Sequence, residues 1–351
     1  MKPVLANGLL FAATVLVCLV VVEVTLRSTL YNFKPYTRSP GPSSSYPIER
    51  AEFKTMITTN RLNMRDHEVG PRQESEHRIL CLGDSFTFGL GVDFEETYPQ
   101  QIERILRQED PGTRVLNGST GGNAVDALKF LKEQGLALEP YLVILQVYTG
   151  NDFYDGMRYL PRELTPEPPA AAPPGSFFIK TKETIRGFRL SLVDFLWKGL
   201  IQVPWIDNLL FQTEMRYGNR GIYLRTYPKL EEALVDVELN AIEQVRQLCA
   251  QNDIRLFVMI IPAREQVFKR KFLTNEKYDH KKPNRILQDF CRKNGIEFID
   301  FLDVYEQEHP ADVKPLYYVQ DEHWTPRGQA FAAQTLSGFL TRRKLRMPLK
   351  P

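Results

Sequence analysis

A serine, a histidine and an aspartate in this chain have the spacing needed for acyl-transfer chemistry on an ester. Ser85 ends a GDS tripeptide that directly follows the apolar run ILCL, and His323 stands two residues after Asp321. In a serine triad, an acid orients one imidazole nitrogen while the other nitrogen takes the proton of the nucleophile. The residues therefore predict Ser85 as the nucleophile, His323 as the base and Asp321 as the acid that orients it.

Each of these residue types also has an ordinary structural interpretation. Asp84 and Ser85 are both common helix-capping residues in a strand-to-helix turn. The motif lacks the GxSxG pattern, because Thr87 stands where the second glycine belongs, so the nucleophile elbow of α/β-hydrolases is not indicated. A lone histidine is more often a surface or core residue than a base, and this interpretation is the expected one for His67, His77, His280 and His309.

Hydrogen-bond donors for a developing oxyanion follow two other apolar runs. GSTGGN comes after TRVLN and ends in Gly122 and Asn123, and GND comes after YLVILQVYT and contains Asn151. Glycine lets a backbone N–H approach a ligand closely, and the asparagine amide is a neutral donor. With the N–H of Ser85, Gly122 and Asn151 could form three donors around one oxyanion. The alternative is that these are common turn residues.

The elements that must position these residues alternate along the chain. Short apolar runs separated by amphipathic stretches are typical of parallel strands buried on both faces. The predicted strands are Arg78–Leu82, Thr113–Asn117, Tyr141–Val147, Ile254–Ile261 and Ile296–Asp300. The predicted helices are Tyr98–Gln108, Ala124–Leu136, Leu230–Gln251, Asn284–Asn294 and Pro326–Thr341. The sequence therefore predicts an α/β fold with a central parallel five-stranded sheet and the site at its carboxyl edge.

The N-terminal segment predicts a membrane anchor. Pro3–Val22 contains no charged residue, and about twenty residues at about 1.5 Å per residue match the roughly 30 Å hydrocarbon core of a bilayer. We expect an uncleaved transmembrane anchor over residues 1–25, although lysine and arginine counts do not orient it. Proline, serine and glycine in Lys34–Pro47 favour a solvated tether over residues 26–47. The catalytic domain is then expected over residues 48–351.

An insertion interrupts the alternation at residues 154–230. It contains a proline-rich stretch followed by an apolar segment, Gly187–Phe211. We expect this apolar segment to form a second small core, and the alternative is an amphipathic stretch, Arg189–Leu210, that lies on lipid. We expect residues of the insertion to determine which substrate is bound.

Composition excludes several other classes of protein. The 351 residues are 43% hydrophobic and 25% charged, which is typical of a globular protein of one large domain or two modest ones. The formal net charge is +2, so no nucleic-acid partner is expected. No CxxC or HxxxH spacing occurs, and no metal or cofactor is predicted. The cysteines are expected to be free thiols, although Cys249 and Cys291 could form a bridge if their Cα atoms lie within about 7 Å.

These blocks, taken in order, resemble the SGNH, or GDSL-type, hydrolases. The blocks are GDSFTFG, NGSTGG, GND and the Asp–His pair before the last helix, and the lead-in TTNRLNMRD resembles membrane-anchored bacterial members. The resemblance implies a flavodoxin-like three-layer α/β/α fold, ester hydrolysis through an acyl-serine, and an extracytoplasmic domain. It also implies that Ser85 is the nucleophile, that Gly122 and Asn151 are the oxyanion donors, and that Asp321 and His323 complete the triad.

Two departures from the family pattern leave alternatives open. The usual DxxH spacing is DxH here, so Glu322 is a possible substitute for Asp321, and the doubled glycine makes Gly121 a competitor to Gly122. The expected function is a serine esterase acting on acyl esters, O-acetyl above all, of a cell-envelope glycan or lipid. The alternatives are an envelope O-acyltransferase that uses the same triad and a non-catalytic anchored scaffold.

Overall fold

The computed structural model describes residues 14–25, 41–50, 52–119, 121–164, 203, 205–206, 220–319 and 321–342. The chain divides into two compact units. One unit comprises Met1–Thr37 and Pro166–Gly218, and the other comprises Arg38–Thr165 and Asn219–Pro351. All the predicted site residues lie in the second unit, which we therefore describe first.

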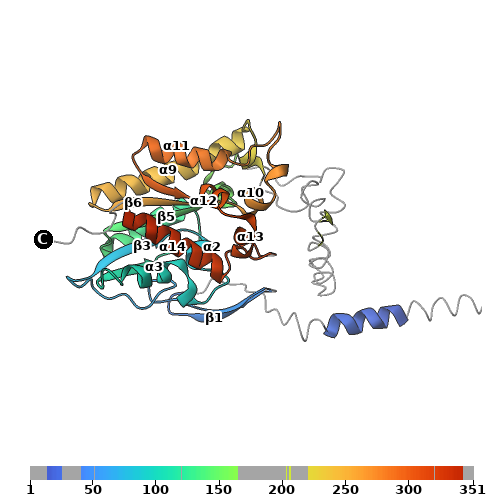
Figure 1. Ribbon diagram of the computed structural model, residues 1–351, viewed down its shortest axis with the longest axis horizontal. Coiled ribbons are helices and arrows are strands. Elements are labelled where there is room, and N and C mark those ends of the chain that lie inside the picture. The colour runs from blue at the N-terminus through green and yellow to red at the C-terminus, as the bar shows by residue number, and fades with distance from the viewer. Residues whose placement is uncertain are drawn as a thin grey trace, which may run out of the picture. The chain divides into compact units, whose positions relative to one another are not determined.

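A five-stranded parallel sheet forms the centre of the second unit, as predicted (Figure 1). Its strands lie in the order β4-β3-β5-β6-β7, which is the flavodoxin-like order. Ligands in such sheets bind beyond the carboxyl ends of the strands where the order reverses, which here is beside β3. The strands are β3 (His77–Leu82), β4 (Thr113–Asn117), β5 (Leu142–Tyr148), β6 (Arg255–Ile261) and β7 (Glu297–Asp300).

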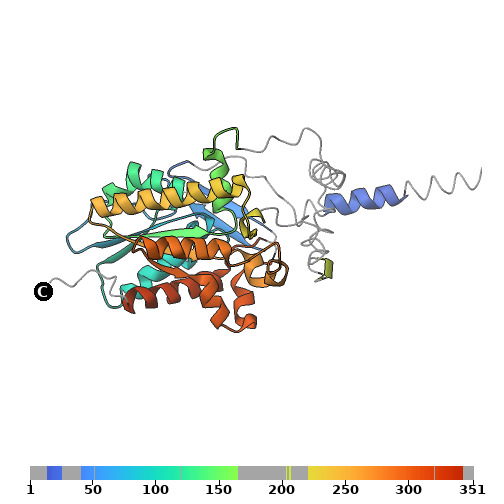
Figure 2. The ribbon, with the colours of Figure 1, turned by 90° about the horizontal axis from the view of Figure 1, so that it is seen from above.

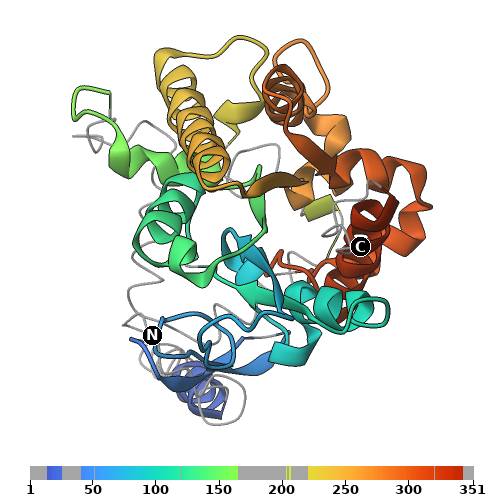
Figure 3. The same cartoon turned by 90° about the vertical axis from the view of Figure 1, so that its left-hand side faces the viewer.

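Helices cover both faces of this sheet, which explains why its strands are mostly apolar. All seven residues of β5 are buried. The helices α3 (Tyr98–Leu106) and α14 (Pro326–Arg342) pack together, and α4 (Ala124–Phe130) packs on α9 (Lys229–Gln251). Figures 2 and 3 show these two pairs on opposite sides of the sheet, which gives the three layers expected from the sequence.

The remaining helices are mostly short. The predicted helix Asn284–Asn294 is confirmed as α11, whereas the predicted helix Ala124–Leu136 is α4 followed by a π turn (Leu131–Gly135) and a 3-10 turn (Leu136–Leu138). Helix α11 spans Lys282–Lys293. Four to seven residues carry too little periodicity to be recognised from sequence, so the other helices were not predicted. These are α2 (Ser85–Phe88), α5 (Asp152–Asp155), α10 (Arg264–Phe268), α12 (Phe301–Gln307) and α13 (Pro310–Val313).

An antiparallel hairpin precedes the sheet and changes the expected boundary of the tether. Strands β1 (Ser45–Glu49) and β2 (Lys54–Thr58) pair over their whole lengths, from Ser45 with Thr58 to Glu49 with Lys54. The prediction of a solvated tether was therefore wrong for residues 45–47. A two-stranded hairpin tolerates Pro47, so the serine- and proline-rich composition concealed a strand.

The predicted membrane segment lies partly outside the described residues. Residues 14–25 are helical, and their apolar side chains are exposed. In the described ranges, no helix has both the length and the apolar character needed to cross a membrane. Residues 1–13 and 26–40 lie outside those ranges. The expectation of an anchor at Pro3–Val22 is taken up again below as a proposal.

The insertion also lies mostly outside the described residues. Its predicted apolar segment, Gly187–Phe211, is described only at residues 203, 205 and 206, so the choice between a small core and a lipid-facing stretch Arg189–Leu210 stays a prediction. Where the described chain resumes, Ile222 and Tyr223 are buried in a 3-10 turn. Residues 222 and 223 of the predicted insertion therefore belong to the core of the second unit.

All four cysteines are free thiols, as predicted. Cys81 is fully buried in β3 and packs there as a small apolar side chain. Burial raises the pKa of Cys249 and that of Cys291 to about 12, although the charge of Arg292 lowers the second slightly. The bridge between these two cysteines that the sequence allowed is not formed.

Candidate active site

The turn that presents Ser85 is fixed from the neighbouring strand. Asp84 caps α2, because its Oδ1 accepts the N–H of Phe86 at 2.8 Å. Gln146 of β5 accepts the N–H of Asp84 through Oε1 at 3.0 Å. A Cβ at Gly83 would lie 2.3 Å from the same Oε1, so this close approach requires glycine. Ser85 thus begins a four-residue helix immediately beyond the carboxyl end of β3.

Arg65 holds the other end of this short helix. Burial lowers the pKa of Arg65 to about 10, although nearby Tyr46 and Asp93 act in the opposite direction. The next residue, Asp66, accepts the N–H of Asn117 at 2.8 Å and so holds the end of β4. The Arg65 guanidinium donates to three carbonyl oxygens, at 3.0, 2.5 and 2.7 Å, which belong to Phe88, Gly89 and Val92. The lead-in motif therefore braces the turn that carries Ser85.

Ser85, His323 and Asp321 lie in one hydrogen-bonded chain. Ser85 Oγ is 2.7 Å from His323 Nε2, and His323 Nδ1 is 2.5 Å from Asp321 Oδ1. The imidazole packs on the ring of Phe86, with centroids 5.2 Å apart. If Nδ1–H donates to the carboxylate, Nε2 is left to accept the hydroxyl proton of Ser85. This is the geometry of a nucleophile next to an oriented base.

The structure brings Asp321, and not Glu322, to the imidazole. Both ring nitrogens of His323 are already engaged, one by Ser85 and the other by Asp321. Burial raises the pKa of the Asp321 carboxyl, but the hydrogen bond and charge of His323, together with those of Arg50, outweigh it, and the pKa is lowered overall. Asp321 is therefore ionised at neutral pH, as an orienting acid must be.

The three predicted oxyanion donors follow the three adjacent strands β4, β3 and β5. In the part of the chain that the structure describes, the N–H groups of Ser85 and Gly122 have no hydrogen-bond acceptor. Gly121 N–H instead donates to the hydroxyl of Ser119 at 3.3 Å, which leaves Gly122 as the free donor of the pair. Asn151 Nδ2 donates to Asp155 at 2.6 Å and keeps a second hydrogen for a ligand.

Three buried carboxyl groups lie behind this edge of the sheet, and the sequence did not predict them. Burial raises the pKa of Asp84 to about 6, that of Glu238 to about 8, and that of Asp152 well above its usual value. Each has one carboxyl oxygen without a hydrogen-bond partner among the described residues. Glu238 lies on α9, where the sequence suggested only a long amphipathic helix, and it accepts the N–H of Ala124 at 3.3 Å. Glu238 is therefore neutral in the folded chain at pH 7.

We expect Glu238→Gln to remove a pH dependence of stability. Between the ordinary carboxyl value of 4.5 and the raised value of about 8, the unfolded chain has lost the proton that the folded chain still holds. The free energy of unfolding therefore falls as pH rises, by about 1.4 kcal/mol per pH unit for one proton. In thermal melts, the Tm of Glu238→Gln minus the Tm of wild type should therefore increase from pH 5 to pH 8.

The control for this prediction is Asp236→Asn, because Asp236 is exposed on the same helix. Its effect on Tm should be small at every pH. A difference between Glu238→Gln and wild type that stays constant from pH 5 to pH 8 would contradict the prediction.

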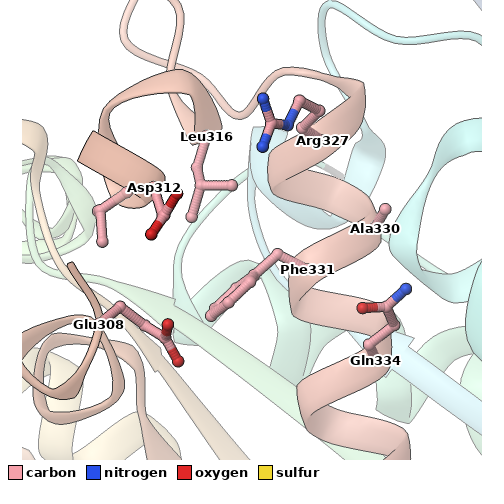
Figure 4. Close-up of a pocket in the computed structure, with 8 residues that line it drawn as sticks. Glu308, Asp312, Leu316, Arg327, Ala330, Phe331 and Gln334 are labelled. Carbon is pink, nitrogen blue, oxygen red and sulfur yellow. The ribbon is translucent and has the colours of Figure 1, made fainter. Parts of the chain in front are cut away.

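A cavity of about 370 Å³ is formed by residues other than Ser85, Asp321 and His323. Figure 4 shows Phe331 and Arg327 projecting from α14, with Glu308 and Asp312 on the opposite wall. None of the five predicted site residues lines it. We place the chemistry at the strand ends and not in this cavity, because Ser85 lies next to His323 there, whereas no serine or histidine lines the cavity.

Comparison with known families identifies one part of the chain. Residues 216–349 match the family model of the SGNH hydrolase-like domain of the acetyltransferase AlgX. The matched part contains Asp321 and His323, whereas Ser85, Gly122 and Asn151 precede it. This match is in agreement with the resemblance to SGNH hydrolases seen in the sequence motifs. None of the curated proteins matches the chain.

Several solved structures are similar to the chain at low identity. An acetyl xylan esterase, AlAXEase, is 13% identical, with a TM-score of 0.44 over 75% of this chain and 99% of that one. A two-domain esterase active on acetylated mannans is 12% identical, with a TM-score of 0.44 over 79% of this chain and 52% of that one. A GDSL-like lipase from Bacteroides thetaiotaomicron is 14% identical, with a TM-score of 0.38 over 79% and 93%. These activities are those of the solved proteins.

Proposed function

We propose that this protein is a serine esterase that hydrolyses acyl esters, O-acetyl above all, of a cell-envelope glycan or lipid. The observation that carries the proposal is the continuous chain from Ser85 Oγ through His323 to Asp321, with distances of 2.7 and 2.5 Å. An assembled nucleophile, base and orienting acid is what acyl transfer requires.

In the proposed first step, Ser85 Oγ attacks the ester carbonyl carbon while His323 Nε2 takes its proton. The carbonyl oxygen becomes an oxyanion that accepts hydrogen bonds from the N–H groups of Ser85 and Gly122 and from the amide of Asn151. Collapse of this intermediate breaks the ester C–O bond, and the imidazolium protonates the departing alcohol oxygen. Asp321 stays ionised throughout and stabilises the imidazolium. The product of this step is an acyl-serine.

In the second step, a hydroxyl compound removes the acyl group. His323 takes the proton of the incoming hydroxyl, whose oxygen attacks the acyl carbon. The bond between the acyl carbon and Ser85 Oγ then breaks, and the imidazolium returns the proton to Oγ. With water, the product is a carboxylic acid and the protein is an esterase. With a glycan hydroxyl, the product is a new ester and the protein is an O-acyltransferase.

The O-acyltransferase is the second candidate, and one observation favours it. The family model that matches residues 216–349 is that of an acetyltransferase, and the match includes the base and its acid. The two candidates share every residue of the site and differ only in the acceptor.

We also propose that the catalytic unit is extracytoplasmic and anchored by an N-terminal single-pass helix. The support is the uncharged segment Pro3–Val22, whose length suits a bilayer. An acylated glycan or lipid of the envelope would then be accessible to Ser85. We propose no nucleic-acid partner.

The deciding experiment uses the purified full chain in detergent with p-nitrophenyl acetate. Release of p-nitrophenol is measured with and without an oligosaccharide acceptor, and acetylated sugar is detected by mass spectrometry. Acetate as the product supports the esterase, and acetylated sugar supports the acyltransferase. If there is neither turnover nor labelling by a fluorophosphonate, both proposals fail and the chain is a non-catalytic scaffold.

A further inference from the structure

The segment that joins β1 to β2 contacts the loop that carries Asp321 and His323. We call Arg50, Glu52 and Phe53 the hairpin connection. The N–H of Arg50 donates to the carbonyl oxygen of Phe53 at 2.8 Å, which closes the turn. Arg50 and Asp321 are 271 residues apart in sequence, yet their side chains form an ion pair. The acid of the triad is therefore held by a part of the chain that none of the sequence motifs includes.

Glu52 fixes the main chain at Asp321. Its Oε1 accepts the N–H of Val319, and its Oε2 accepts the N–H of Asp321, both at 2.9 Å. A carboxylate can accept both hydrogen bonds, whereas a glutamine side chain has one acceptor oxygen and would place its NH₂ against the second N–H. The two bonds therefore need the carboxylate of Glu52.

Arg50 fixes the carboxylate of Asp321 itself. Its Nη1 donates to Oδ2 of Asp321 at 2.5 Å, while Oδ1 of the same carboxylate is hydrogen-bonded to Nδ1 of His323. Exposed ion pairs usually contribute little, and the Arg50 side chain is 46% exposed. The Asp321 side chain, however, is only 5% exposed, and charge-assisted hydrogen bonds to a buried carboxylate are strong and directional. With Oδ2 held by Arg50, Oδ1 faces the imidazole.

Packing between the hairpin connection and the loop supports these polar contacts. The rings of Phe53 and Tyr318 lie 5.2 Å apart, and Phe53 is almost fully buried. The N–H of Tyr318 donates to the carbonyl oxygen of His323 at 2.8 Å. The loop is therefore held at residues 318, 319, 321 and 323.

We infer that Arg50 and Glu52 are positioning residues of the acyl-transfer reaction, which hold the Asp321 carboxylate in the orientation that stabilises the His323 imidazolium. The inference rests on the proposed function of Ser85, His323 and Asp321. Because the two residues act on the transition state through Asp321 and His323, their loss should lower kcat and leave KM nearly unchanged.

The first test compares three variants of the full chain on p-nitrophenyl acetate. Arg50→Ala should lower kcat by about 10–100-fold, the effect of a small misplacement of a catalytic group. Arg50→Lys keeps a cation near Asp321 and should retain most of the activity, and added guanidinium chloride should partly restore Arg50→Ala. The control is Lys54→Ala, which removes a cation of the same hairpin whose 3.2 Å pair with Glu49 is exposed, and its kcat should equal that of wild type.

Wild-type kcat in Arg50→Ala would overturn the inference. So would equal losses in Arg50→Ala and Arg50→Lys without rescue by guanidinium, because a merely structural role for the side chain predicts that pattern. If wild type itself shows no turnover and no fluorophosphonate labelling, the proposed function fails instead, so the two failures are distinguishable.

The second test uses Glu52→Gln alone and together with Arg50→Ala. Glu52→Gln should lower kcat with KM nearly unchanged. The loss in the double variant should be smaller than the product of the two single losses, because both residues act on the same carboxylate. Fully multiplicative losses would mean that the two residues act independently, and would overturn their shared role.

Discussion

Ser85→Ala is expected to lower kcat by roughly 10⁶-fold, because removing the nucleophile abolishes every step that depends on it. The variant should also lose labelling by a fluorophosphonate. Its Tm should stay close to that of wild type, because the one side-chain hydrogen bond that Ser85 Oγ makes within the described chain is to His323. Turnover of p-nitrophenyl acetate by the purified variant, next to its thermal melt, checks both expectations.

Folding must be separated from catalysis in this comparison. Ser119 provides the contrast, because its hydroxyl donates to the carbonyl oxygens of Gly83 and Asp84 and so holds the turn before Ser85. Ser119→Ala should lower Tm and leave Ser85 open to labelling. Turnover at the wild-type rate in Ser85→Ala would remove Ser85 from the mechanism.

Asp321→Asn is expected to lower kcat by about 10⁴-fold, which is the usual effect of this change in a serine triad. An amide NH₂ facing Nδ1 favours the tautomer in which Nε2 carries the proton and cannot accept one from Ser85. The change also leaves Arg50 without its carboxylate partner. The measurement is kcat for p-nitrophenyl acetate at pH 7 to 8.

Glu322→Gln is the matched control for Asp321→Asn. It alters the adjacent acid that the DxH spacing left as an alternative, and kcat should stay within a few fold of wild type. A greater loss in Glu322→Gln than in Asp321→Asn would reassign the orienting acid to Glu322.

The sheet was predictable because its strands are buried on both faces. Continuous apolar runs such as LVILQVY in β5 occur where helices cover both sides, and this pattern survives in sequence without any partner being known. The position of Ser85 at the edge of the sheet was predictable for the same reason, whereas its proximity to His323 was expected from triad chemistry and from the family resemblance. Once Ser85 and Asn151 are placed at strand ends, the carboxyl edge of a parallel sheet brings them together.

The supporting residues were not predictable, because long-range contacts alone define them. Arg50 and Glu52 are charged residues in a short turn, and such residues are usually solvated. Arg65 and Glu238 are buried charged residue types, and burial of a single polar residue leaves no periodic signal. The sequence favoured Gly122 and left Gly121 as a competitor, and the hydrogen bond from Gly121 N–H to Ser119 that bears on this choice requires coordinates.

Because Ser85 is far in sequence from Asp321 and His323, the ribosome makes these proposed triad residues at different times. Ser85 and His323 are 238 residues apart, so at about 5–20 residues per second the serine leaves the ribosome on the order of tens of seconds before its base is made. Asp321, which orients that base, is made equally late. Throughout that interval Ser85 is an ordinary alcohol without a base to activate it. Under the proposed mechanism, the growing chain therefore cannot acylate Ser85 with the help of this pair until residues 321–323 have been made.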